Sequence, residues 1–389
     1  MMKLKSIPKQ VVILGFVSLF TDIASEMLYP VTPIFLTTVL GSSMAVVGII
    51  EGIAEVTAGL LKGYAGNLSD KTKKRSIFVV IGYSLSGLVK PLPGIFPNIS
   101  SIIISRTTDR IGKGIRTAPR DALLGSYSEG NSGAIFGFHR GMDTLGAAIG
   151  PLVAILLLYL YPGNFQLIFL FAFLPSVVAV SFTLFVKDRP LTSKNNSRLS
   201  YAKFWKGAPK QYKILLILIV IFSFVNSSDV FLILKSEYVS GSATLAILGY
   251  VFYNLIYAST SYPFGKLSDK LGKNIIFGTG LLIFSLIYFG FALSTKMIFI
   301  WILFGLYGVY AASTEGISKA WISDLVADEM KGSAIGLVTM LSSLSIMLGS
   351  FTTGILWDNF GSTIPFLLSA VVSLIIGTIT LSLRFGKGH

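Results

Sequence analysis

The chain has 389 residues, of which 53% are apolar and only 13% are charged, and its formal net charge is +14. Water-soluble domains typically carry about 25% charged residues. This composition, with a mean hydropathy of +0.74, therefore excludes a soluble globule and indicates an integral membrane protein. The chain contains no cysteine, which excludes disulfides, thiolate metal sites and a cysteine nucleophile.

Apolar runs recur along the chain, and each is long enough to cross about 30 Å of hydrocarbon as an α-helix. In the first half we expect helices over 10–37, 43–66, 75–95, 99–120, 132–160 and 164–186. In the second half we expect helices over 213–237, 243–265, 274–294, 297–325, 333–357 and 362–385. The first run is too long for the core of a signal peptide, so it is retained as a helix. The sequence thus predicts an all-α, multi-pass integral membrane protein with twelve transmembrane helices.

Basic residues alternate with the predicted loops. Lysines precede the first helix, and clusters of lysine and arginine follow the second and eighth helices, whereas the turns near 41–43 and 161–164 carry none. By the positive-inside rule, both termini are expected to be cytoplasmic. This distribution explains the positive charge by topology, so we expect no nucleic-acid partner. The bilayer is the expected surrounding, which is the inner membrane if the source is bacterial.

One half of the sequence repeats the other. The segment Gly-Asn-Leu-Ser-Asp-Lys at 66–71 returns as Gly-Lys-Leu-Ser-Asp-Lys at 265–270, and Gly-Ala-Ile-Phe-Gly at 133–137 returns as Gly-Ser-Ala-Ile-Gly at 332–336. Both repeats have an offset of 199 positions (265 minus 66, and 336 minus 137). Duplicated hydrophobic halves are typical of secondary transporters.

The long polar stretch over 187–212 separates the two copies. It divides the chain into an N-terminal six-helix bundle over 1–186, a cytoplasmic basic linker, and a C-terminal six-helix bundle over 213–389. Aromatic residues between Tyr201 and Trp205 interleave with its lysines. This pattern fits a short interfacial helix and equally a solvated basic linker.

The duplicated loops, their positions after the second and eighth helices, and the central basic loop resemble the major facilitator superfamily. In that family a basic residue follows the loop aspartate by four positions, as Lys74 and Lys273 do here. The fourth-helix signature of the family resembles Arg110, Lys113 and Gly114. The resemblance implies two pseudo-symmetric six-helix halves that alternately expose a central site to each side of the membrane.

The resemblance also implies a cytoplasmic gate, a charge cluster that stabilises the outward-open state. Its expected members are Gly66, Asp70, Lys74, Asp121, Gly265, Asp269 and Lys273. The offset carries Asp121 onto Ala320, so Asp324 is the expected substitute in the second copy. A fifth-helix signature that ends in Gly-Pro, common in drug and proton antiporters, implies a hinge at Gly141, Gly146, Gly150 and Pro151.

Charged residues within predicted helices are costly in a bilayer and are expected to face water or a partner. Asp22 and Glu26, like Glu51 and Glu55, are four positions apart, so each pair lies on one helix face. Neighbouring carboxylates do not both ionise cheaply, which is the chemistry of proton coupling. We therefore expect these four acids and Arg110 to couple transport to protons.

Arginines on the fourth helix are candidates for substrate binding. Arg106 and Arg110 are expected to face the central cavity, whereas Arg116 and Arg120 are expected to reach the cytoplasmic surface by snorkelling. The expected substrate-binding set is Asp22, Glu26, Arg106, Arg110, Tyr29, Asp229, Tyr253 and Glu315. The alternative is that such buried charges form static ion pairs that hold helices together.

These features favour a proton-coupled antiporter that exports a small organic molecule such as a drug, a metabolite or a siderophore-like compound. The alternative is proton-coupled uptake or exchange of an anionic metabolite held by Arg106 and Arg110. A membrane enzyme or a channel is a remote alternative, because the chain has only two histidines and lacks His-Glu-x-x-His, Gly-x-Ser-x-Gly and phosphate-loop motifs. No cofactor or metal is expected, and the chain is expected to act as a monomer on its substrate and protons.

Overall fold

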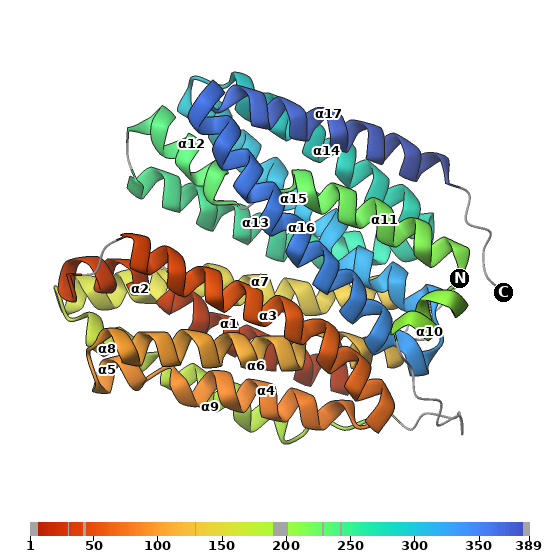
Figure 1. The fold of residues 1–389 in the computed structure, drawn as a ribbon, viewed down its shortest axis with the longest axis horizontal. Helices are drawn as coiled ribbons and strands as arrows, with labels where there is room; N and C mark the ends of the chain where they lie inside the picture. Colours follow the sequence, from red (N-terminus) through yellow and green to blue (C-terminus); the bar gives the residue numbers. More distant parts are fainter. Residues whose placement is uncertain are drawn as a thin grey trace. The chain divides into compact units, whose positions relative to one another are not determined.

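The computed structural model describes residues 7–29, 31–41, 44–128, 130–189, 201–227, 229–241 and 243–383, and the regular structure within them is helical (Figure 1). Helices occupy each range expected in the first half. Their bounds are α1 (Lys9–Leu28), α2 (Val31–Ile34), the π-helix η1 (Phe35–Val39), α3 (Met44–Thr72), α4 (Arg75–Val89), α5 (Leu92–Ile95), α6 (Ile99–Ser126), α7 (Ser132–Leu160), α8 (Phe165–Phe171) and α9 (Phe173–Thr183).

Helices also occupy the linker and each range expected in the second half. Their bounds are α10 (Tyr201–Gly207), α11 (Lys210–Val225), α12 (Val230–Ser240), α13 (Ala243–Leu271), α14 (Lys273–Leu293), α15 (Met297–Leu325), the 3₁₀-helix η2 (Asp328–Met330), α16 (Lys331–Phe360) and α17 (Thr363–Ser382). Helix α10 lies where an interfacial helix was expected, while residues 190–200 of the linker lie outside the described residues.

Several expected helices are interrupted, and the prolines explain two of the breaks. Pro91 follows the end of α4 and precedes α5, and proline supplies no backbone N–H to continue a helix. Pro175 removes the donor that would pair with the carbonyl of Phe171, where α8 ends. The range over 213–237 divides into α11 and α12 around Asn226.

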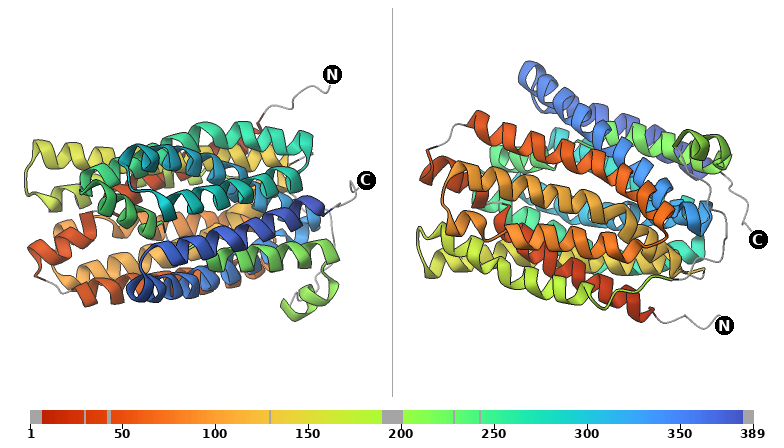
Figure 2. Two further views of the ribbon diagram at one scale, coloured as in Figure 1. Left: turned by 90° about the horizontal axis from the view of Figure 1, so that it is seen from above. Right: turned by 60° about the horizontal axis from the view of Figure 1, so that its bottom comes forward.

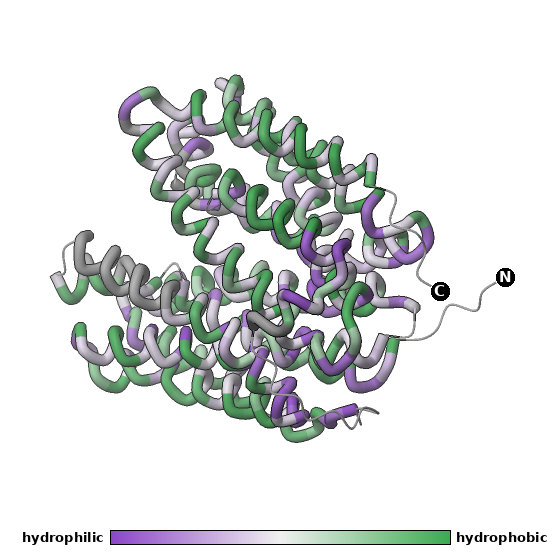
Figure 3. The backbone as a smooth tube through the Cα atoms, turned by 45° about the vertical axis from the view of Figure 1, so that its right-hand side comes forward, coloured by the Kyte–Doolittle hydropathy of each residue, from purple (hydrophilic) through white to green (hydrophobic). Residues whose placement is uncertain are grey.

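Eight of the described helical segments are long and apolar enough to cross a membrane. They lie over 9–28, 75–95, 132–160, 165–183, 273–293, 297–325, 328–357 and 363–382. Figure 3 shows hydrophobic residues along the helices and hydrophilic residues gathered in loops and at helix ends. Twelve crossings and the cytoplasmic termini stay predictions.

The helix bounds reproduce the sequence repeat. Helix α3 begins at Met44 and α13 at Ala243, and both contain 29 residues. Helix α7 begins at Ser132 and α16 at Lys331, with 29 and 30 residues. Each later helix therefore begins 199 positions after its counterpart, so the duplication extends well beyond the short motifs.

Contacts divide the chain into two compact units. Unit 1 comprises Met1–Tyr127, Met142–Gly207 and Ala327–Met340, and unit 2 comprises Ser128–Gly141, Ala208–Val326 and Leu341–His389. Each unit thus contains most of one sequence half together with the first turns of a helix from the other half, α16 in unit 1 and α7 in unit 2. The domain boundaries at 186 and 213 stay predictions.

The helices that position the site lie in unit 1. Helix α6 packs against both α3 and α4, and α1 packs against α9 (Figure 1 and Figure 2). The close packing of α4 on α6 depends on Gly82 and Gly112, because a Cβ at Gly82 would lie 2.6 Å from the Gly112 carbonyl oxygen. In unit 2, α14 packs against α15 and α17.

Candidate functional site

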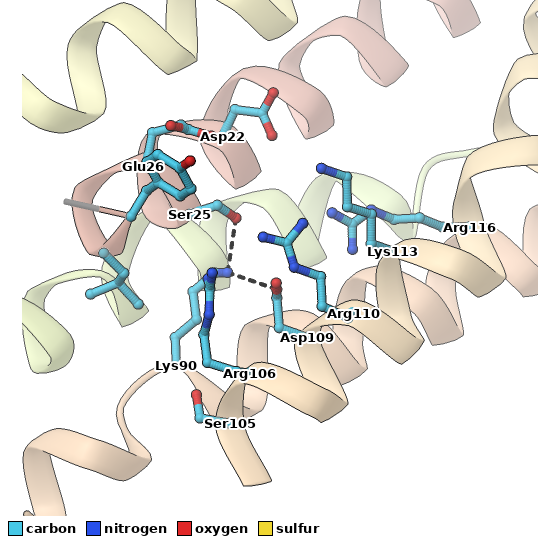
Figure 4. A pocket seen from close by; sticks show the side chains of 12 residues that line it. Asp22, Ser25, Glu26, Lys90, Ser105, Arg106, Asp109, Arg110, Lys113 and Arg116 are labelled. Atoms are coloured by element: carbon cyan, nitrogen blue, oxygen red, sulfur yellow. Dashed lines mark hydrogen bonds and ion pairs between the residues drawn. The ribbon is translucent and has the colours of Figure 1, made fainter. Parts of the chain in front are cut away.

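A polar cavity of about 270 Å³ lies within unit 1 between α1, the end of α4, and α6 (Figure 4). Its lining consists of Asp22, Ser25, Glu26, Leu28, Tyr29, Lys90, Ser105, Arg106, Asp109, Arg110, Lys113 and Arg116. The α6 residues recur every three or four positions, which places them on one helix face. The cavity therefore brings together Asp22, Glu26, Tyr29, Arg106 and Arg110, residues that the sequence singled out.

Basic side chains outnumber acidic ones in the part of this cavity lining that the structure describes, with five basic and three acidic residues. Figure 4 shows Arg106, Arg110 and Lys113 directed from α6 toward α1, where Asp22 and Glu26 lie. All three basic groups interact electrostatically with Glu26, and Lys113 also with Asp22. The two acids of α1 therefore have basic neighbours on the opposite wall.

The third acid, Asp109, already has a basic partner. The Lys90 ammonium lies 3.1 Å from the Asp109 carboxylate and donates a hydrogen bond of 3.0 Å to the Ser25 hydroxyl (Figure 4). Lys90 is only 2% exposed. The sequence analysis missed this residue, although a single lysine within the apolar run over 75–95 was a usable signal. The pair joins α4 to α6 at one wall of the cavity.

The expectation that Arg116 and Arg120 snorkel to the cytoplasmic surface is wrong. Arg116 is 4% exposed, donates a hydrogen bond of 2.5 Å to Ser86 and lies over the Tyr83 ring, 4.2 Å from its centroid. Arg120 is 7% exposed and forms an ion pair of 2.9 Å with Asp121. Both guanidinium groups have polar partners inside unit 1. These partners replace the hydrogen bonds that water would otherwise supply, so both side chains are buried.

Two of the expected coupling acids cannot be placed. The side chains of Glu51 and Glu55 lie outside the described residues, although both positions belong to helix α3. Among the described residues, no group of three or more histidine, aspartate or glutamate side chains could hold a metal ion.

The expected substrate residues of unit 2 lie among tyrosines. Asp229 accepts a hydrogen bond of 2.7 Å from the Tyr307 hydroxyl, and the Tyr253 ring lies 4.9 Å from the Tyr307 ring. Glu315 forms an ion pair with Arg140, which also donates a hydrogen bond of 2.5 Å to the Tyr257 hydroxyl. Asp229 and the Arg140–Glu315 pair therefore each lie beside tyrosine side chains.

The first copy of the expected gate meets the start of α16 within unit 1. The Asp70 carboxylate accepts hydrogen bonds from the backbone N–H groups of Gly332 at 3.2 Å and Ser333 at 2.6 Å. Its ion-pair partner is Arg75, at 3.0 Å, whereas Lys74 is exposed. A carboxylate at a helix N-terminus interacts favourably with the helix dipole. Burial raises the pKa of Asp70 and outweighs the opposing effect of Arg75.

The second copy repeats this geometry within unit 2, at the start of α7. Asp269 accepts hydrogen bonds from the backbone N–H groups of Gly133 at 2.9 Å and Ala134 at 2.8 Å. Lys273 pairs with Asp269 at 3.1 Å and with Asp324 at 2.8 Å. Burial lowers the pKa of Lys273, but the two carboxylates outweigh it and raise the pKa overall. Asp324, the expected substitute acid, thus contacts Lys273 in this cluster, and its role in a gate stays a prediction.

Glycines permit the close approach at both contacts. A Cβ at Gly66 would clash with the Gly332 carbonyl, and one at Gly265 would clash with the Gly133 carbonyl. The expected hinge glycines of α7 also line helix contacts: Gly146 and Gly150 face α1, while Pro151 lies inside the uninterrupted α7. The gate and hinge roles of these residues stay predictions.

Comparisons with known proteins identify the family. A family model described as the Major Facilitator Superfamily matches residues 14–248 and 214–388. An uncharacterized MFS-type transporter of Methanocaldococcus jannaschii is 33% identical over 383 residues, which is 97% of this chain and 95% of that protein. An uncharacterized protein of Mycobacterium tuberculosis is 24% identical over 356 residues, 90% of this chain and 86% of that protein.

Solved structures share the fold at low sequence identity. The human organic anion transporter MFSD10 has a TM-score of 0.82 and 14% identity, covering 96% of this chain and 100% of that one. The Escherichia coli fucose:proton symporter FucP has a TM-score of 0.76 and 12% identity, covering 95% of this chain and 98% of that one.

Proposed function

The chain belongs to the Major Facilitator Superfamily, and from that premise we propose that it is a secondary active transporter that carries a small organic anion together with a proton. The observation that carries the proposal is the composition of the cavity in unit 1, where five basic and three acidic side chains are found among the described lining residues. Basic groups outnumber acids in this described lining even with Lys90 and Asp109 taken as a pair. A carboxylate or phosphate group of the substrate would interact favourably with such a wall.

The chemistry of the wall suits such a group. Arginine presents a planar array of N–H donors that matches carboxylate and phosphate oxygens bidentately. Arg106 and Arg110 are one helical turn apart on the same face of α6. The cavity volume of about 270 Å³ lies below the roughly 300–1,000 Å³ of pockets for drug-sized ligands. We therefore propose a small anion, with Arg106 and Arg110 as its main contacts.

The direction of proton coupling follows from charge linkage. Protonation of Asp22 or Glu26 removes a negative charge that faces Arg110 and Lys113, which makes the cavity more positive. A more positive cavity binds an anion more tightly, and by reciprocity a bound anion favours protonation. Positive linkage of this kind favours movement of proton and anion in the same direction. One structural neighbour is an organic anion transporter and another a proton symporter, but at 14% and 12% identity neither decides the substrate.

The proton-coupled exporter favoured by the sequence is the second candidate. Asp22 and Glu26 line the same cavity as the basic residues, so a cationic substrate would compete with protons for these acids. Competition gives negative linkage, and negative linkage favours exchange of substrate for protons. The two candidates therefore differ in the sign of the pH effect on substrate binding.

A thermal-shift screen of the purified protein at two pH values distinguishes the candidates. Small carboxylates and phosphate esters are compared with small amines of similar size. A ligand at 100 times its dissociation constant stabilises the folded state by about 2.7 kcal/mol. We expect anions to raise the melting temperature, and to raise it more at the lower pH.

Variants assign the effect to the cavity. Arg110→Met should abolish the stabilisation by anions, whereas Lys206→Met removes the same charge from an exposed position and should retain it. Stabilisation by amines alone, and more strongly at the higher pH, would overturn the anion proposal in favour of the exporter. Retention of the anion effect in Arg110→Met would remove Arg110 from the binding site.

A further inference from the structure

Helix α7 makes backbone contact with α1 along one side of the cavity in unit 1. A Cβ at Gly146 would lie 3.0 Å from the Asp22 Cβ and 3.2 Å from the backbone nitrogen of Ile23. One turn further, a Cβ at Gly150 would lie 2.9 Å from the Glu26 Cβ. A Cβ at Gly146 would also lie 2.4 Å from the Leu19 carbonyl oxygen. Real Cβ atoms essentially never make contacts shorter than 3.0 Å, so glycine is required at both positions. The two helices therefore approach closely beside the acids of α1.

This approach brings a second aspartate, Asp143, to Asp22. Asp143 lies one turn before Gly146 on α7, and Ser18 lies one turn before Asp22 on α1. The Ser18 hydroxyl donates a hydrogen bond to the Asp143 carboxylate. The Asp22 and Asp143 carboxyl groups therefore lie on the same side of the α1–α7 contact and interact electrostatically. Asp143 is only 8% exposed.

Two neighbouring buried carboxyl groups do not both ionise cheaply. An ionised carboxylate accepts hydrogen bonds but has no proton to donate, whereas a protonated one donates. One proton held between the two groups removes their repulsion and leaves the pair with one negative charge. Two carboxyl groups in such contact release their protons in steps that belong to the pair and not to either residue.

Charged groups of α1 and α6 face this pair. On the Asp22 side they are Glu26 of α1 and Lys113 of α6, and on the Asp143 side Arg120 of α6. The Arg120 guanidinium donates a hydrogen bond of 3.5 Å to Ser18, which itself donates to Asp143, and one of 3.2 Å to the Tyr83 hydroxyl of α4. On α7, His139 and Arg140 lie about one turn before Asp143.

We propose that Asp22 and Asp143 together form the proton-binding site of this transporter, sharing one proton across the contact between α1 and α7. The sequence had paired Asp22 with Glu26, and the inference deepens the proposed proton coupling, on which its role in transport rests. When the shared proton leaves to water in the cavity, two ionised carboxylates face each other. Their repulsion acts directly on the α1–α7 contact, while Lys113 and Arg120 compensate the second negative charge.

Infrared spectroscopy of the protein in lipid tests the pair without substrate or a proton gradient. The C=O stretch of protonated carboxyl groups is measured as a function of pH in the wild type, in Asp22→Asn, in Asp143→Asn and in the double variant. We expect each single variant to lose the amplitude of one carboxyl group, and the double variant to lose no more than either. Asp328→Asn, at a half-buried aspartate paired with Lys331, should keep the wild-type amplitude.

Two results would overturn the pair. Full amplitude in Asp143→Asn would mean that Asp22 holds the proton alone, and a double variant that loses two carboxyl groups would mean that each aspartate holds its own. If Asp143→Asn does not fold, Gly146→Ala gives the same test, because it forces α7 away from α1 without removing a carboxyl group. Loss of the band in Gly146→Ala supports the pair, and its retention overturns it.

The outcome is separable from that of the proposed function. A shared-proton band in a protein whose flux ignores a pH gradient would refute proton coupling and leave the pair intact. Proton-driven flux that persists in Asp143→Asn would refute the role of the pair and leave proton coupling intact.

Discussion

Removing Asp109 should destabilise the protein much more than removing Lys90, although the two residues form one ion pair. At the 3.1 Å separation of the pair, the attraction amounts to about 5 kcal/mol with an effective dielectric constant of about 20. Desolvation of both groups offsets most of this energy. The net effect of each substitution therefore depends on what the remaining charge faces.

The surroundings of the pair are positive. Arg110, Arg116 and Arg106 all interact with Asp109. Asp109→Asn leaves Lys90, which is 2% exposed, among these cations, so we expect a loss of about 3–5 kcal/mol, the usual cost of an uncompensated buried charge. Lys90→Met leaves Asp109 with the arginines as partners. We therefore expect the free energy of unfolding to fall by about 1 kcal/mol, which is the usual net contribution of one hydrogen bond.

The melting temperature can be measured from tryptophan fluorescence during heating, because the chain contains four tryptophans. The chain contains no cysteine, so disulfide exchange does not complicate the unfolding. For a unit of this size, about 1 kcal/mol corresponds to about 2–4 °C in melting temperature. The shift in Asp109→Asn should thus exceed that in Lys90→Met about threefold, while Lys296→Met, at an exposed position, should leave the melting temperature unchanged. Equal shifts, or a larger shift in Lys90→Met, would refute the reasoning that the arginines decide the asymmetry.

Three further predictions concern the contacts at the starts of α7 and α16. Asp70→Asn turns one acceptor into a donor that faces backbone N–H groups, so the melting temperature should fall by the equivalent of about 2 kcal/mol; no change would exclude a stabilising contact. Lys273→Met should lower the free energy of unfolding by a constant amount at pH values below the ordinary lysine pKa of 10.5. Above that pH the difference between variant and wild type should shrink, because the pKa of Lys273 is raised in the folded protein and its stabilising contribution disappears as the lysine loses its proton. A difference that grows with pH would contradict this sign. Gly265→Ala, which meets the Gly133 carbonyl, should lose about 1–3 kcal/mol to overpacking, whereas Gly207→Ala, with open space around it, should show no loss.

The candidate site was partly predictable, because charge in an apolar helix is visible in the sequence. The four-residue spacing of Asp22 and Glu26, and of Arg106 and Arg110, predicted shared helix faces, and all four residues line one cavity. The sequence could not show which charges neutralise each other. Asp109 found its partner in Lys90 on another helix, and such pairings depend on which helices pack together.

The gate illustrates the same limit. The repeated motif pointed to Asp70 and Asp269, and both accept backbone hydrogen bonds at the first residues of a helix from the other sequence half. The motif also pointed to Lys74, but Arg75 makes the ion pair. A one-residue difference rotates a side chain by about a quarter turn around a helix, and only packing decides which neighbour faces inward.

The sequence by itself determined the membrane character, the helical class and the duplication, because hydropathy and repeats are properties of the chain read in order. Tertiary structure alone decided which buried groups of different helices meet: Lys90 with Asp109, and Ser18 with Asp143. The physical reason is that a buried charged group is stable only beside a compensating charge or a hydrogen-bond donor. That partner is supplied by whichever helix the glycines allow to approach.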